Sequence, residues 1–165
     1  MLEYHATAIY HTFDMHIDKI DRLQNSFLDE LGLTAKEALM EFNFAPLNSS
    51  RDIAMLAVLH RRVLGQMHRD FDKLLPFYSS SDSRKHNKQL IAAPHVNNFQ
   101  QCLWSRSIFA LVHVYNRLPQ RMIDLTCIKE FQHELTVILK RRCSSDPDLW
   151  DHVFDPRLRA YDIFT

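Results

Sequence analysis

Only two glycines, Gly32 and Gly65, occur among the 165 residues of the chain, and this scarcity restricts the fold more than any other feature. An all-β fold needs glycine-rich turns, and phosphate-binding loops need glycine runs, so both are disfavoured. Hydrophobic residues make up 46% of the chain, which is enough to bury a core. We therefore predict an all-α fold, an irregular bundle of about five to seven short helices, with a short extended segment near residues 88–96.

The most apolar long stretch spans residues 106–124 and reads RSIFALVHVYNRLPQRMID. An element that is apolar on all sides is usually buried on all sides, and the spacing of the large side chains favours a central helix over residues 104–115. Asn116 is expected to act as its C-cap, and Pro119 is expected to open the next helical turn. A buried strand is the alternative, because many of these residues are β-branched or aromatic.

Two helices are expected near the start of the chain. Residues 14–31 carry side chains at helical spacing, namely Ile17, Ile20, Leu23 or Gln24, Phe27, Leu28 and Leu31. Gly32 should end this helix as a C-cap glycine. Thr34 and Glu37 have the spacing of a capping box, which begins a short helix that ends near Asn43. Residues 2–13 fit either a helix or a strand.

Three more helices are expected further along. Residues 48–64 form one, with Ser49 or Ser50 as its N-cap, and residues 67–75 form a short one. Thr126 should cap the last, whose core-facing residues are Ile128, Phe131, Leu135, Ile138 and Leu139. Residues 1–143 are thus predicted as one helical region. Residues 144–165 are predicted as a C-terminal tail that can start a short helix.

Cysteine usage and the lack of long apolar runs indicate the compartment. Cys102, Cys127 and Cys143 are widely spaced and odd in number, which is typical of free thiols in a reducing environment. The first residues lack the basic segment and apolar core of a signal peptide. No apolar run approaches the roughly 20 residues that cross a bilayer. The sequence therefore predicts an intracellular protein, in the nucleus or the cytoplasm, with no membrane partner.

The net charge is zero, yet the charges are unevenly distributed. Residues 84–143 carry 10 Lys and Arg against 3 Asp and Glu, a net charge of +7. Residues 1–50 and 144–165 carry net charges of −5 and −3. A basic segment between acidic flanks can contact phosphates, and a set of solvated helix faces is an equally good interpretation.

Known catalytic motifs are missing from the sequence. The ten histidines have no HxxxH or HExxH spacing and no CxxC accompanies them, so no metal and no other cofactor is expected in this chain. There is no GxSxG nucleophile motif and no Asp-Asp pair for two-metal polymerase chemistry. His60 and His133 are interpreted as hydrogen-bonded structural histidines. Phe99, Trp104 or Tyr78 could stack on bases near the basic segment, although a place in the core is favoured.

Several motifs follow one another in a recognisable order over residues 4–143. They are IDRLQNSFL at 20–28, APLNSSRDIAML with LHRRVLG over 45–65, SRKHNKQL at 83–90, RSIF with YNRLP over 106–119, and FQHEL at 131–135. This ordered set resembles the region that follows the polymerase core in reverse transcriptases of non-LTR retrotransposons, of the LINE or Jockey-like type.

The resemblance implies a C-terminal fragment of an RNA-directed DNA polymerase that is inactive by itself. In such enzymes the metal-binding carboxylates, including a Phe/Tyr-x-Asp-Asp motif, lie upstream of this region, and so does the endonuclease domain. No catalytic residue is therefore carried over to this chain. The zinc-binding Cys/His cluster of some related elements has no counterpart here either.

The resemblance and the charge distribution together predict contacts with template–primer phosphates, with RNA, DNA or an RNA–DNA hybrid and the upstream polymerase core as partners. The residues expected to make these contacts are Arg84, Lys85, Lys88, Arg106, Arg117, Arg121, Lys140, Arg141 and Arg142. An alternative is a helical protein-interaction or structural domain, in which the apolar faces of residues 14–31 and 128–139 dock on the polymerase or on a second copy. A degenerate element without present function is a further alternative.

Overall fold

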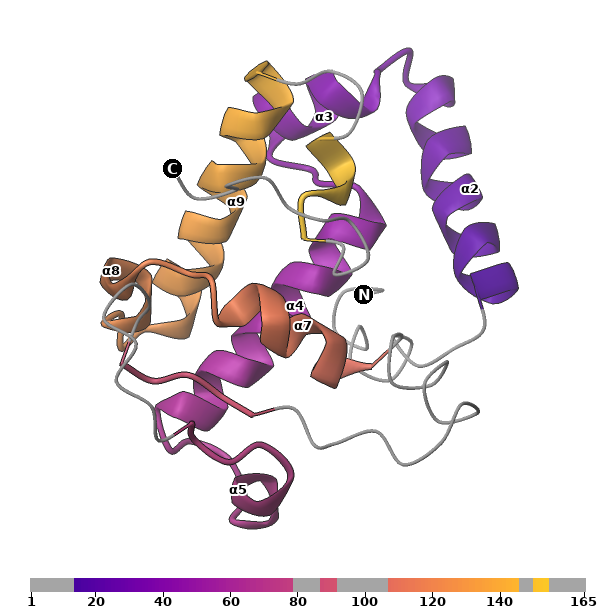
Figure 1. Cartoon of the computed structure of the whole chain (residues 1–165). Coiled ribbons are helices and arrows are strands. Elements are labelled where there is room, and N and C mark those ends of the chain that lie inside the picture. Colours follow the sequence, from indigo (N-terminus) through magenta and orange to yellow (C-terminus); the bar gives the residue numbers. More distant parts are fainter. Residues whose placement is uncertain (1–13, 79–86, 92–106, 146–149, 155–165) are drawn as a thin grey trace.

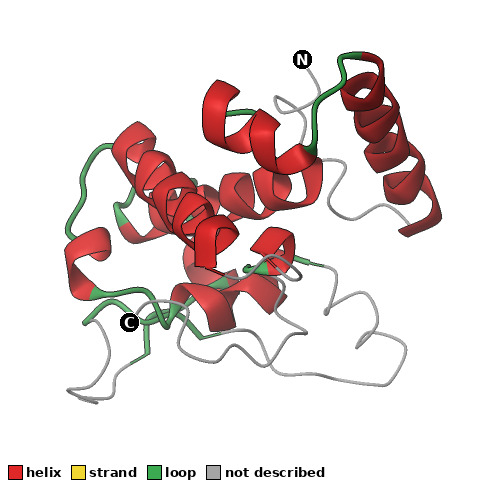
Figure 2. Ribbon diagram, turned by 90° about the horizontal axis from the view of Figure 1, so that it is seen from above, coloured by secondary structure: helices red, strands yellow, loops and turns green. Residues whose placement is uncertain are grey.

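The structure is a computed structural model that describes residues 14–78, 87–91, 107–145 and 150–154. These residues form seven α-helices, and no β-sheet occurs among them (Figure 2). The predicted all-α bundle is confirmed. In chain order the elements are α2 (Asp14–Glu30), α3 (Ala35–Phe42), α4 (Leu47–Val63), α5 (Asp70–Leu74), α7 (Ile108–Tyr115), α8 (Gln120–Ile123), α9 (Ile128–Ser145) and the 3-10 turn η2 (Trp150–His152).

The helix α4 is the axis of the bundle (Figure 1). The helices α7 and α9 pack along it, α2 contacts both α4 and α3, and η2 contacts α4 and α9. The short helix α5 follows the end of α4, at the opposite end of the molecule from α3. Fully buried side chains from α4, α7 and α9 form the centre of the core, including Leu56, Leu59, Leu111, Tyr115, Phe131 and Leu135. Burying one such side chain stabilises the fold by about 1.5 to 3 kcal/mol.

The local signals around α3 are confirmed. Gly32 follows α2 in the left-handed region, at a φ of 67°. The capping box is formed: Thr34 N donates to Glu37 Oε2 at 2.8 Å, and Glu37 N donates to Thr34 Oγ1 at 3.2 Å. The bonds that the Thr34 N–H and the Thr34 hydroxyl donate to the Glu37 carboxylate lower the pKa of Glu37. The helix α3 ends at Phe42, and Asn43 follows as a left-handed C-cap with a φ of 57°.

The predicted N-cap of α4 is wrong. The helix begins at Leu47, directly after Pro46, and no side chain caps it. Ser49 and Asn48 instead donate to the backbone carbonyl of Asp151, Ser49 Oγ at 2.7 Å and Asn48 Nδ2 at 2.9 Å. Their side chains therefore bond to a residue that is far away in the sequence, and local spacing does not reveal this contact.

Two further helices, the last one and the one predicted over residues 67–75, have bounds that differ from the prediction. The helix α9 begins at Ile128, so the N-cap position belongs to Cys127, whose carbonyl accepts from Phe131 N at 3.1 Å, and Thr126 does not hold it. The core-facing residues predicted for this helix are buried or packed against the core. The helix expected over residues 67–75 is reduced to the five residues of α5.

The apolar stretch forms a helix and not a strand. The helix α7 starts at Ile108, where Ser107 Oγ accepts from Phe109 N at 3.3 Å. Asn116 follows as the C-cap residue, with right-handed backbone angles, and Pro119 precedes α8 as predicted. The residues before Ser107 that were included in this prediction lie outside the described part of the chain.

An extended segment is present where it was expected, as far as the described residues reach. Phe77 and Leu90 form an isolated antiparallel bridge. Tyr78 N donates to Gln89 O, and Ile91 N donates to Pro76 O, both at 2.8 Å. The rest of the predicted extended segment and residues 2–13 lie outside the described residues.

Candidate nucleic-acid interface

The nine cations predicted to contact phosphates separate into three sets. One set lies outside the described residues: Arg84, Lys85 and Arg106. A second set is exposed and lies near α8: Lys88, Arg117 and Arg121. The third set lies in the last turns of α9: Lys140, Arg141 and Arg142.

Two amide side chains hold the segment that carries Lys88 beside α8. Asn116 Oδ1 accepts from Leu90 N at 2.9 Å, and Asn116 Nδ2 donates to Leu90 O at 2.8 Å. Asn87 N donates to Gln120 Oε1 at 3.0 Å. Because Asn116 and Gln120 directly precede Arg117 and Arg121 in the sequence, these bonds bring Lys88 to the same corner of the molecule as the two arginines.

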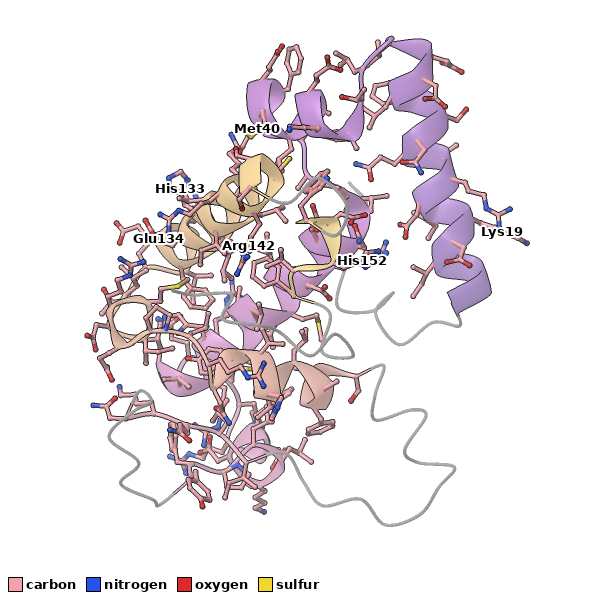
Figure 3. The ribbon with its side chains drawn as sticks, turned by 45° about the horizontal axis from the view of Figure 1, so that its top comes forward. Lys19, Met40, His133, Glu134, Arg142 and His152 are labelled. Carbon is pink, nitrogen blue, oxygen red and sulfur yellow. The ribbon has the colours of Figure 1, made fainter. Side chains whose placement is uncertain are left out.

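The cations of α9 lie away from this corner. An α-helix rises about 1.5 Å per residue, so Lys140 is about 18 Å along the axis from Ile128. Lys140 Nζ donates to the carbonyl of Met40 at 3.4 Å, which places this set beside α3. Figure 3 shows Met40 next to the end of α9 that carries Arg142. The described cations therefore do not form one continuous surface.

Arg62 is a cation that was not assigned to the interface from the sequence. It lies in the last turn of α4 and is 7% exposed. Its Nη1 pairs with Asp72 Oδ1 at 3.2 Å, and its Cζ lies 4.6 Å from the centre of the Phe77 ring. A guanidinium at this distance from an aromatic face makes a favourable cation–π contact. Phe77 lies beyond the end of α4, so the position of Arg62 in the sequence does not reveal this contact.

Two exposed aromatic residues adjoin these cations. Phe77 is 45% exposed and Tyr78 is 51% exposed, and their backbone pairs with residues 89–91. We name the following set the basic–aromatic surface: Arg62, Phe77, Tyr78, Lys88, Arg117 and Arg121. The segments that contribute to it, residues 61–78, 87–91 and 116–124, contain seven Lys and Arg against three Asp, a net charge of +4. Of the three aromatic residues that the sequence suggested for stacking on bases, only Tyr78 lies within the described residues, and it is not in the core.

A buried polar centre lies between α4, α7 and α9. His60 is fully buried, with its Nδ1 at 2.9 Å from the Tyr115 hydroxyl and its Nε2 at 2.7 Å from the Leu125 carbonyl. The imidazole stacks on Phe131, with ring centres 4.1 Å apart and planes inclined by 8°. Since a carbonyl only accepts, Nε2 carries the proton and Nδ1 accepts from the Tyr115 hydroxyl.

This centre is structural and not catalytic. Burial lowers the pKa of His60 and raises the pKa of Tyr115, so both groups stay neutral near pH 7. Both imidazole nitrogens are engaged, and neither ring is accessible to solvent. A general base needs an open path to the proton that it removes. The interpretation of His60 as a hydrogen-bonded structural histidine is therefore confirmed, whereas His133, for which the same was predicted, is exposed on α9.

The described residues offer no site for a metal ion. No group of three His, Cys, Asp or Glu among them is placed to hold one. Cys127 is exposed and Cys143 is buried, and burial raises the pKa of the Cys143 thiol. Among the helices of the described part, none is long and apolar enough to cross a membrane.

A second exposed surface lies at the other end of α4. Six large apolar side chains of α2, α3 and the residues after them are exposed, and we name them the α2–α3 apolar surface: Leu23, Phe27, Leu31, Met40, Phe42 and Phe44. The rings of Phe27 and Phe44 meet edge to face, with centres 6.5 Å apart. Residues 17–44 contain three Lys and Arg against six Asp and Glu, a net charge of −3. This end of the molecule is apolar and acidic.

The two apolar faces that the protein-interaction hypothesis invoked have different surroundings. The face of α9 is in the core, because Phe131, Leu135 and Leu139 are fully buried. It cannot dock on a partner, and that part of the hypothesis is wrong. The face of α2 is largely exposed at Leu23 and Leu31, so it remains accessible.

Comparisons of the chain with protein-family models, with curated proteins and with solved structures find no match.

Proposed function

We propose that this chain is the non-catalytic C-terminal region of a retrotransposon reverse transcriptase, and that it contacts the phosphates of a template–primer duplex through Lys88, Arg117 and Arg121. The observation that supports this role is the pair of bonds between the Asn116 amide and the backbone of Leu90. Asn116 belongs to the Tyr-Asn-x-Leu-Pro motif of the resemblance, and Leu90 ends the basic motif SRKHNKQL. A direct contact joins two motifs that are 26 residues apart.

This contact is a physical reason for the basic motif and the Tyr-Asn-x-Leu-Pro motif to occur together in one chain. The amide of Asn116 satisfies both backbone groups of Leu90, which is 2% exposed. A buried backbone group without a partner costs about 1 to 3 kcal/mol, so the basic segment is held firmly at the end of α7. Cations on a fixed segment lose less conformational entropy when they bind phosphates than cations on a mobile one. Such contacts do not depend on base sequence and weaken steeply with salt.

The experiment is a binding titration with a fluorescent RNA–DNA hybrid at low and at moderate salt. Reversing the charge of all three residues (Lys88→Glu, Arg117→Glu, Arg121→Glu) should weaken binding about a hundredfold at low salt and flatten the salt dependence. The matched control reverses the three cations at the end of α9 (Lys140→Glu, Arg141→Glu, Arg142→Glu). The net charge changes by the same amount, so a smaller loss is expected if position matters as well as charge. Undetectable binding at both salt concentrations, or equal losses in the two triple variants, would contradict the proposal.

A second candidate function is docking on the upstream polymerase core through the α2–α3 apolar surface. Leu23, Leu31 and Phe42 are 66%, 56% and 63% exposed, which is unusual for three large apolar side chains in one region of a small protein. Leu23, Phe27 and Leu31 are spaced four residues apart and form one stripe along α2. In the full polymerase this stripe would be covered by the core. In the isolated chain it should drive self-association, which sedimentation measures.

A further inference from the structure

We propose that the exposed rings of Phe77 and Tyr78, on opposite faces of one extended segment, each form a stacking platform for unpaired bases of a single-stranded nucleic acid, whose phosphates meet Lys88, Arg117 and Arg121. The inference rests on the proposed nucleic-acid role and deepens it, because it adds the bases to the phosphates. Stacking on the two rings requires unpaired bases and so points to a single strand. The phosphate contacts alone would not distinguish a single strand from a duplex.

The backbone under the two aromatic residues is fixed on both sides. Residues 76–78 pair with residues 89–91 through the Tyr78–Gln89 and Ile91–Pro76 bonds. The central residue of the second segment, Leu90, is in turn bonded to Asn116 at the end of α7. Three segments thus lie side by side and tie the aromatic residues to the core. A fixed aromatic side chain loses little entropy when a ligand stacks on it.

Phe77 is held in place by its side chain as well. The guanidinium of Arg62 lies over the ring at 4.6 Å, and Arg62 is fixed from the other direction by its ion pair with Asp72. The ring is nevertheless 45% exposed. The Phe77 ring therefore contacts the Arg62 guanidinium and remains partly exposed to solvent.

The charge around the platform favours a polyanion over a protein partner with an apolar patch. Lys88 directly precedes Gln89, whose carbonyl accepts from Tyr78 N. Of the two acidic residues of α5, Asp72 pairs with Arg62, and Asp70 Oδ2 lies 3.1 Å from His68 Nδ1. The surrounding segments retain the net charge of +4 given above. Aromatic residues next to a positive path are the arrangement with which proteins bind single strands without sequence preference.

The two exposed rings can add to the affinity for an unpaired strand and not to the affinity for a duplex, whereas the phosphate contacts are open to both. In a duplex both faces of each base are covered by neighbouring bases, so exposed aromatic rings find only the phosphates. In a single strand the bases are free to stack on Phe77 or Tyr78 while the phosphates contact Lys88 and Arg117. Each stacked base should strengthen binding about tenfold.

The test compares two fluorescent oligonucleotides of about 12 nucleotides, within the span that such sites cover. One is oligo-deoxythymidylate, and the other is an abasic strand with the same number of phosphates. Both are titrated with the full chain at one salt concentration. The platform predicts that the strand with bases binds at least about tenfold more tightly than the abasic strand.

The variants separate stacking from folding. Tyr78→Ala should lose most of the preference for bases, and Tyr78→Phe should keep it, because only the hydroxyl is removed. Phe77→Ala should also lose it, with a thermal melt to show whether the loss of the Arg62 contact unfolds the chain. Phe42→Ala is the matched control, since it removes a ring that is even more exposed than those of Phe77 and Tyr78, at the opposite end of α4.

Each outcome decides the inference. A preference for bases that Tyr78→Ala removes and Phe42→Ala leaves intact supports the platform. Equal affinity for the two strands, with steep salt dependence, overturns the platform and leaves the phosphate contacts standing. Binding to neither strand overturns the platform, and the hybrid titration then decides the proposed function separately. A change in oligomeric state on Tyr78→Ala, without a change in oligonucleotide binding, identifies the surface as a contact between copies and also overturns the platform.

Discussion

The two ends of α4 are built in the same way and present opposite surfaces. At the α2–α3 end, the amide of Gln24 donates from Nε2 to Ala45 O at 2.9 Å and accepts at Oε1 from Leu47 N at 2.8 Å. At the other end, the amide of Asn116 makes the equivalent pair of bonds to Leu90. In each case one side-chain amide bonds to a backbone N–H and to a backbone carbonyl of the segment that it holds.

The difference lies in what each fastened segment displays. The α2–α3 end displays aliphatic and phenyl groups with a net negative charge, and the other end displays two aromatic rings, and also Leu74 and Ile91, among cations. Since the amide bonds of Gln24 and Asn116 are alike, the two surfaces differ in their exposed side chains and in their charge. The proposals place protein docking at the first end and nucleic-acid contact at the second, and each proposal can be tested without disturbing the other end.

The largest effect on stability is expected from His60→Gln, which would weaken both ends together because His60 is a buried core residue of α4. The variant loses the stacking on Phe131 and at least one of the two buried hydrogen bonds. The free energy of unfolding should fall by about 3 kcal/mol at pH 7. Chemical denaturation followed by circular dichroism measures it, with His133→Gln as the exposed control. A loss confined to one end, as seen by hydrogen exchange, would contradict the central role of this contact.

The same variant should change the response to pH. Burial holds the pKa of His60 below the usual value of about 6.5, so in mildly acidic solution the unfolded chain binds a proton that the folded chain does not. The contribution of His60 to stability is complete above pH 6.5 and is lost as the pH falls below it. His60→Gln should therefore lose less stability than the wild type between pH 7 and pH 5. If the free energies of unfolding of the wild type and His60→Gln fall in parallel between pH 7 and pH 5, His60 does not titrate in this way.

The next effect is expected from Asn116→Ala, which should loosen only the basic–aromatic end. It leaves the backbone N–H and C=O of Leu90 without their partner, at a cost of about 2 kcal/mol. Amide hydrogen exchange should accelerate in residues 89–91 and remain unchanged in α2. The affinity for oligonucleotides should fall together with the protection. Faster exchange at both ends would mean that the two supports are not independent.

A somewhat smaller effect is expected from Gln24→Ala at the opposite end. The lost partners are Ala45 O and Leu47 N, which are partly exposed and can be reached by water, so the cost should be about 1 kcal/mol. The bidentate ion pair of Arg51 with Asp21, at 2.8 Å for both contacts, still attaches α2 to α4. Exchange should accelerate around residues 45–47, with oligonucleotide binding intact. Impaired oligonucleotide binding in this variant would break the division of roles between the ends.

The smallest effect on stability is expected from Leu23→Ser combined with Leu31→Ser. Both side chains are more than half exposed, so the free energy of unfolding should change by less than about 0.5 kcal/mol. Self-association should nevertheless decrease in sedimentation, because these two residues provide much of the apolar stripe on α2. Leu74→Ser, at the α5 end, is the matched control. An unchanged sedimentation profile would remove the support for docking through this surface.

Local sequence signals predicted the parts of the fold in which partners lie within four residues of each other. The capping box of Thr34 and Glu37, the left-handed Gly32 and the spacing of the core residues in α9 are of this kind. Each depends on the geometry of one helical turn, which the sequence alone specifies.

Polar residues with distant partners were not predictable in the same way. Ser49 has the residue type and position of an N-cap, yet its hydroxyl bonds to Asp151. Asn116 was expected only to end a helix, and its amide instead holds Leu90. The spacing of α2 predicted an amphipathic helix, but spacing does not reveal which element covers its apolar stripe. The candidate interface was therefore predictable as a list of cations and not as an arrangement, because Arg62 and Phe77 meet only through the fold.

The bonds of Asn48 and Ser49 to Asp151 also bear on the order in which the molecule can be completed during synthesis. Their partners are 103 and 102 residues apart in the chain. At about 5 to 20 residues per second, a ribosome needs about 5 to 20 seconds to proceed from the start of α4 to Asp151. Throughout that interval the nascent α4 lacks this acceptor, and for the first part of it α4 also lacks α7 and α9, which cover its apolar side. The bundle can therefore close only after Asp151 has been synthesised, and a chaperone that binds exposed apolar helices would meet α4 before α9 does.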